Sequence, residues 1–176
     1  HCDAEAILHV YLENAVWPDA QDLPAWLGSS VTLLSDESGG NAFDEACSSL
    51  WWKLARKFPQ YPIPNACLAS TVEFRGKCDV DEAIAEQDAC NLLHFLQGRG
   101  VIRGESKTPP VLVSPATPLE GVAMVTAAHA GVVSYLVSPG AVLQQGDPLA
   151  VLIDPLERGV NLSLIHISEP TRLHCI

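Results

Sequence analysis

The sequence predicts an α/β domain over residues 1–107, followed by a small all-β domain over residues 108–161. In the first part, runs rich in β-branched and aromatic residues alternate with helical runs, which is typical of a layered α/β fold. The pattern changes after Lys107, where the linker Thr108-Pro109-Pro110 is followed by short β-type runs without a helix signal.

The first part opens with two short strands and a helix between them. Residues 6–12 (AILHVYL) and 31–34 are the predicted strands, because β-branched, aromatic and other apolar residues dominate them. Residues 21–27 are expected to form a short helix that ends at Gly28. The loop at residues 35–41 (SDESGGN) is predicted to lie on the surface, with the lining of a substrate pocket as the alternative.

A longer helix follows this loop. Asp44 is the predicted N-cap, and the helix runs to about Lys57, where Phe58-Pro59 stops it. Its apolar face is expected to consist of Leu50, Trp51, Leu54 and Phe58, which recur at helical spacing, and Trp51 and Trp52 are expected to be core and interface residues.

The next strand and helix carry a possible functional carboxylate. Residues 67–74 (CLASTVEF) predict a buried strand that delivers Glu73 at its carboxyl end. Asp79 or Asp81 is expected to cap the following helix, which runs to about Gln97 with Gly98 just beyond its end.

The second domain is predicted from three β-type runs at residues 121–128, 131–137 and 149–153. Turn signals at Pro139-Gly140 and Gln145-Gly146-Asp147 lie between them.

The end of the chain is treated separately. Residues 162–172 read LSLIHISEPTR, which resembles the translation of a transposase adapter used in sequencing-library preparation. Residues 162–176 are therefore expected to be a non-native tail and are left out of the fold prediction. The native part is expected to end near Asn161 in mid-domain, with poor order or exposed strand edges there. Since the chain also begins at His1 without Met, we expect it to be cut short at both ends.

Composition excludes several classes of function. The net charge of −11 argues against nucleic acid and anionic membranes as partners, and no apolar run reaches the roughly 18 residues of a membrane span. Of six cysteines, Cys175 lies in the tail, and the other five include no CxxC pair. A disulfide framework or zinc ribbon is therefore not expected, and scattered thiols favour a cytoplasmic protein.

Two groups of residues have the chemistry of a site. His1, Asp3, Glu5 and His9 would point to one side of an extended segment, so they form either a metal-binding group or a solvated strand edge. Glu73, at the end of an apolar strand, is a candidate general base, because such a carboxylate must be exposed, paired or bound to metal. The alternative for Glu73 is an ion pair with Arg75.

Longer motifs then point to a family. The segment HCDAEAILHVY is similar to the part after Asp-Leu of the DLHCDxEAxxHxY motif in succinylglutamate desuccinylase/aspartoacylase proteins. Further segments resemble the same family in the same order, and together they cover nearly all of residues 1–157: SGGNAFDEACSSLWWKLARKFP, TVEFRGKCDVDEA and PGAVLQQGDPLAVLIDP. The resemblance implies a metallocarboxypeptidase-like mixed sheet with flanking helices, present in part, followed by a small barrel-like β domain.

The resemblance also implies roles for individual residues. His1 matches the third zinc ligand, Glu73 the catalytic glutamate, and Arg75 and His9 are tentative substrate-binding residues. The family's first two zinc ligands lie in an upstream His-x-x-Glu motif, and its oxyanion arginine also lies upstream; this chain contains neither. We therefore expect the chain alone to be inactive and to bind zinc weakly; stoichiometric zinc retained after dialysis would contradict this.

The function implied by the resemblance is zinc-dependent hydrolysis of the amide (or ester) bond of a small N-acyl amino acid or related compound. Zn²⁺ is the implied cofactor, a small N-acyl molecule the implied partner, and the oligomeric state, a homo-oligomer included, is left open. One alternative is a zinc carboxypeptidase acting on peptides. The other is a non-catalytic binding module, because the β domain resembles biotinyl/lipoyl barrels. A carrier of a prosthetic group is disfavoured, since no Lys follows Lys107.

Overall fold

The chain separates into two compact units. A computed structural model describes residues 7–40, 42–105, 107–156, 162–166 and 171–172. The first unit comprises His1–Gly121 and the second Val122–Ile176.

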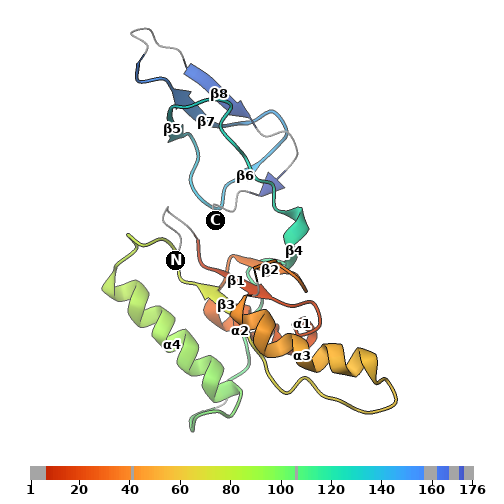
Figure 1. Cartoon of the computed structure of the whole chain (residues 1–176). Helices are drawn as coiled ribbons and strands as arrows, with labels where there is room; N and C mark the ends of the chain where they lie inside the picture. The colour runs from red at the N-terminus through yellow and green to blue at the C-terminus, as the bar shows by residue number, and fades with distance from the viewer. Residues whose placement is uncertain (1–6, 41, 106, 157–161, 167–170, 173–176) are drawn as a thin grey trace. The chain divides into compact units, whose positions relative to one another are not determined.

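The first unit is built on a mixed four-stranded sheet in the order β3-β1-β2-β4 (Figure 1). Its strands are β1 (His9–Leu12), β2 (Val31–Leu34), β3 (Thr71–Glu73) and β4 (Thr117–Pro118). β1 and β2 are parallel, as are β2 and β4, whereas β3 runs antiparallel to β1. The predictions of β1 and β2 are confirmed, and the mixed sheet agrees with the predicted α/β class.

Two short helices and a long one pack on one face of this sheet. α1 (Trp17–Ala20), which the sequence did not predict, leads into α2 (Asp22–Leu27), and α4 spans Glu82–Gly98. As predicted, α2 ends at Gly28, whose φ of 66° is a left-handed conformation that glycine adopts readily. The buried core between the sheet and α1 and α2 consists of Leu8, Val10, Leu12, Val16, Ala20, Leu23 and Leu27, with Leu92 and Phe95 of α4 packed against it.

The helix α3 (Phe43–Lys57) differs from its prediction in both its cap and its buried face. Ala42 precedes it, and Asp44 lies inside the first turn, where its side chain accepts a hydrogen bond from the Glu45 amide. Its buried residues are Ser48 and Trp52, whereas Leu50 is 55% exposed. The core position expected for Trp52 is confirmed, whereas the predicted apolar stripe is not the face that meets the sheet.

The segment around Glu73 is also corrected in detail. The strand predicted over residues 67–74 is reduced to β3, and its three residues are half-buried rather than fully buried. Asp81 is the N-cap of α4, since its side chain accepts hydrogen bonds from the amides of Ala83 and Ile84. Gly98 is the last helical residue, and Gly100, with φ 70°, is the left-handed residue that follows.

None of the helices in the described residues combines the length and the hydrophobicity that a membrane span requires.

The second unit contains short antiparallel strands. β5 (Val132–Tyr135), β7 (Pro148–Ile153) and β8 (Leu162–His166) form one sheet, and β6 (Val142–Leu143) pairs with β9 (Thr171–Arg172). β5 and β7 confirm two predicted strands, whereas residues 121–128 contain no strand. The described residues form two open sheets rather than a closed barrel.

Two segments of the predicted tail therefore lie in strands. The Leu162–His166 segment pairs with β7, from Ile153↔Leu162 to Pro148↔His166, which differs from the poor order expected beyond residue 161. Its LSLI sequence is rich enough in apolar residues to add a strand to an open edge. The non-native origin of residues 162–176 stays a prediction.

Candidate active site

The sheet register places Glu73 directly opposite His9. Glu73 is the last residue of β3, and its Cα partner is His9, the first residue of β1. In open α/β sheets, ligands bind outside the carboxyl ends of the strands. Because β3 is antiparallel to β1, the carboxyl end of β3 lies at the edge opposite the carboxyl ends of β1 and β2.

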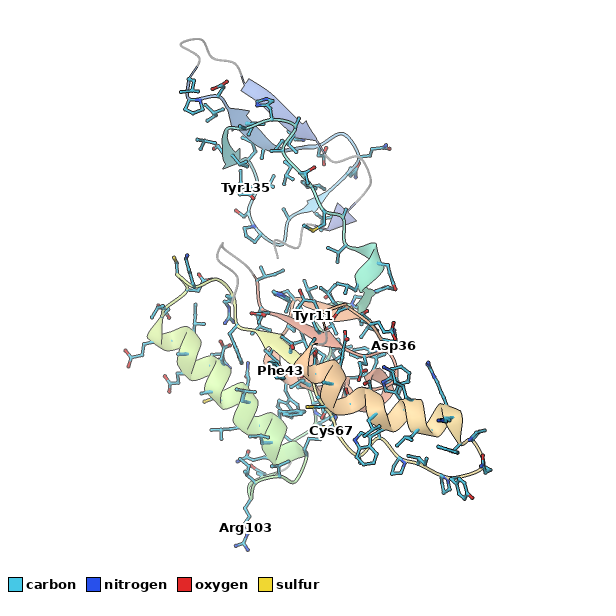
Figure 2. All side chains as sticks on the ribbon, in the orientation of Figure 1. Tyr11, Asp36, Phe43, Cys67, Arg103 and Tyr135 are labelled. Atoms are coloured by element: carbon cyan, nitrogen blue, oxygen red, sulfur yellow. The ribbon has the colours of Figure 1, made fainter. Side chains whose placement is uncertain are left out.

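A cavity lies on the same face of the sheet as Glu73. Tyr11 and Thr71 are paired across β1 and β3, two pairs along from His9 and Glu73, and residues two apart on a strand share a face. Both Tyr11, which is labelled in Figure 2, and Thr71 line a cavity of about 200 Å³. The other lining residues come from the strand ends, the 35–41 loop and the start of α3: Leu12, Glu13, Leu33, Ser35, Ser38, Ala42, Asp44 and Glu45. The loop thus takes the pocket-lining position that the sequence left as the alternative.

Glu13 is a site residue that the sequence analysis missed. It follows β1 and is only 2% exposed. Its Oε1 accepts a hydrogen bond from Nε1 of Trp52 at 2.8 Å, and its Oε2 accepts one from the Ser48 hydroxyl. The available signal was a carboxylate at the end of an apolar strand, the same signal that singled out Glu73. Glu13 therefore ties the wall of the cavity to α3.

His9 packs inside the sheet domain. It is 1% exposed rather than part of a solvated strand edge, and its ring lies edge-on to Tyr11 with 5.3 Å between ring centroids. Its Nδ1 donates to the Ile7 carbonyl at 2.8 Å, which leaves Nε2 as the acceptor in the neutral ring. Within the described part of the chain, this Nε2 has no hydrogen-bond partner. Its contact with substrate stays a prediction.

Arg75 is held by a partner in α4. Its guanidinium donates two hydrogen bonds to the carboxylate of Asp88, from Nη1 at 2.6 Å and from Nη2 at 3.2 Å. Asp88 is a second residue that the sequence analysis missed, since it lies thirteen positions after Arg75, on the following helix.

The predicted zinc ligand cannot be placed in the same way. His1, Asp3 and Glu5 lie outside the described residues. Over the residues that the structure does describe, no three His, Cys, Asp or Glu side chains gather closely enough to hold a metal ion. The described part of the site thus contains the candidate base, the cavity and His9, and these alone do not fit a zinc ion.

Comparisons with known proteins were made by sequence and by structure. No family model matches this chain, and no curated protein matches it. Among solved structures, a succinylglutamate desuccinylase/aspartoacylase family protein from Shewanella amazonensis SB2B is 26% identical, with a TM-score of 0.79 over 98% of this chain and 47% of its own. A second protein described in the same way, from Shewanella frigidimarina NCIMB 400, is 23% identical, with a TM-score of 0.77 over 99% of this chain and 50% of its own. The ectoine utilization protein EutE (DoeB) of Ruegeria pomeroyi is 12% identical, with a TM-score of 0.72 over 97% of this chain and 48% of its own.

The fold and these matches place the chain in the structural class of the succinylglutamate desuccinylase/aspartoacylase proteins. The family resemblance that the motifs carried is confirmed: the chain has the fold of the succinylglutamate desuccinylase/aspartoacylase family. It spans about half the length of the structures that it matches.

Proposed function

We propose that the complete protein hydrolyses the amide (or ester) bond of a small N-acyl amino acid or related compound in a zinc-dependent reaction. The observation that supports this most is the place of Glu73 in a deacylase fold, at the end of β3 and on the same sheet face as the cavity. Glu73 does not line the cavity itself, but Thr71, two residues before it on β3, does, so a substrate that extends along this face from the cavity would approach the carboxylate.

Glu73 is proposed to act as general base and then as general acid. Zinc, when bound through His1 and two ligands outside this chain, would supply a Lewis acid and a water of lowered pKa. The Glu73 carboxylate would accept the proton from the attacking water and later donate it to the leaving amine nitrogen.

The lining of the cavity indicates what part of a substrate it would accept. Three of its residues are carboxylates, Glu13, Asp44 and Glu45, and none of the described lining residues is Lys, Arg or His. A second carboxylate on the substrate would be repelled there, whereas an uncharged or cationic group would not. We therefore expect N-acyl compounds with a neutral or cationic group next to the scissile bond to react fastest.

A substrate panel tests this function. The complete zinc-loaded protein is assayed with N-acyl amino acids of different charge and with matched unblocked peptides, before and after treatment with a chelator. We expect hydrolysis of N-acyl compounds at least about a hundredfold faster than of peptides, and loss of turnover with the chelator. Comparable or faster peptide cleavage would establish the carboxypeptidase alternative instead.

A further inference from the structure

We propose that Arg75 is a positioning residue for Glu73, acting through its pair of hydrogen bonds with Asp88, and that it does not bind a substrate carboxylate. The pair is called the Arg75–Asp88 clamp. The proposal rests on the proposed role of Glu73 as the base.

The first observation is the backbone of Arg75. Its φ is 90°, which makes it the single residue other than glycine with positive φ in the described part of the chain. Residues other than glycine disfavour positive φ, because the Cβ atom clashes with the backbone. Such a conformation persists only where the surrounding structure fixes it. Arg75 lies two residues beyond Glu73. An interaction that fixes the backbone at Arg75 therefore also fixes the backbone at the end of β3, where Glu73 lies.

The second observation is how firmly the clamp is built. The two hydrogen bonds are charge-assisted and parallel, the geometry in which guanidinium and carboxylate interact most specifically. The side chains of Arg75 and Asp88 are 25% and 12% exposed. For a substrate carboxylate to take the place of Asp88, that largely buried acid would lose its partner, which is unfavourable.

The third observation is where Asp88 lies on its helix. Asp88 is the buried residue of α4, and Leu92 and Phe95, which pack on the core, follow it at helical spacing of four and seven residues. The clamp therefore ties the strained turn to the face of α4 that is fixed against the sheet. Glu73 is held from two sides, by its pairing with His9 in β1 and by the clamp beyond it.

The experiment compares Arg75→Lys and Asp88→Asn with a matched control. The control is Asp22→Asn in α2. Asp22 pairs with Arg99 at the carboxyl end of α4, so this change removes a second Arg–Asp pair on the same helix as Asp88. That pair is similarly exposed, at 31% and 23%, and the side-chain hydrogen bond with Asp22 raises the pKa of Arg99. Steady-state kinetics are measured in the complete zinc-loaded protein, and amide hydrogen exchange in the 176-residue chain.

For a positioning role, Arg75→Lys and Asp88→Asn should each lower kcat by about tenfold to a hundredfold, because a small displacement of a catalytic group has effects of this size. KM should stay within about twofold, and the double variant should be no worse than the single ones. In the chain, exchange at the amides of Glu73 and Phe74 should rise by about tenfold in both variants but not in Asp22→Asn.

Two results would overturn the proposal. A raised KM in Arg75→Lys with unchanged kinetics in Asp88→Asn would make Arg75 a substrate-binding residue. An equal loss of kcat in Asp22→Asn would show that the clamp stabilises the fold in general and does not position Glu73. The exchange measurement needs no turnover, so an inactive complete protein would count against the proposed function while exchange at Glu73 still decides the clamp.

Discussion

Changing Glu73 to Gln is expected to lower kcat by about 10²- to 10⁴-fold while the zinc content of the complete protein stays the same. The amide has nearly the shape of the carboxylate but cannot accept the proton from water. Because Glu73 is proposed as the base and not as a ligand, the metal should remain bound.

The measurement is kcat together with the zinc-to-protein ratio, for Glu73→Gln and for the control Glu86→Gln. Glu86 is an exposed carboxylate on α4 and should tolerate the change. Activity within a few-fold of the unchanged protein would show that Glu73 is not the base. Loss of zinc would instead make it a ligand.

Replacing Glu13 by Ala should destabilise the first unit by about 1–3 kcal/mol, the cost of one buried group left without a hydrogen-bond partner. Trp52 would lose the acceptor of its Nε1 hydrogen, whereas Ser48 would keep its second bond, to the Asp44 carbonyl. Ser48 and Trp52 are the buried residues of α3, so the loss acts directly on the contact between this helix and the sheet.

Denaturant unfolding of the 176-residue chain measures this effect. The control is Glu37→Ala in the exposed loop, which should change stability by less than about 0.5 kcal/mol. Glu13→Gln keeps an acceptor for Trp52 and should fall between the two. If Glu13→Ala behaves like the loop control, the carboxylate does not hold α3.

Local signals were sufficient for much of the first unit. β1 and β2 follow from their β-branched and aromatic residues, and the end of α2 follows from Gly28, because these preferences act within a few residues. The position of α4 likewise follows from its Asp81 cap. Glu73 was found for the same kind of reason, as a carboxylate closing an apolar run.

The errors arose where contacts between distant segments decide the structure. The buried face of α3 was predicted from its most apolar stripe, but Glu13, 39 residues before Trp52, turns another face inward. Phe43, which is labelled in Figure 2, is 90% exposed at the start of this helix. Helical periodicity alone could not show this, because it cannot represent a partner outside the helix.

The same reason applies to the site. The pairing of Glu73 with His9 depends on β3 running antiparallel to β1, although the two residues lie 64 positions apart in the sequence (73 − 9). The partner of Arg75 depends on which face of α4 is buried. Sequence patterns supplied Glu73, His9 and Arg75, whereas Glu13 and Asp88 were found only from the register and the helix packing.

The most direct test of the account is the distance between the ring nitrogens of His1 and the carboxylate oxygens of Glu73 in a zinc-loaded crystal structure of the complete protein. A zinc ion with its water should separate them by roughly 4 to 7 Å, given about 2 Å to each zinc ligand and a hydrogen bond from the water to the base. A value in that range, with both groups facing the cavity side of the sheet, is the result that we predict. A separation well beyond about 10 Å, or side chains on opposite faces of the sheet, would contradict the proposed zinc chemistry.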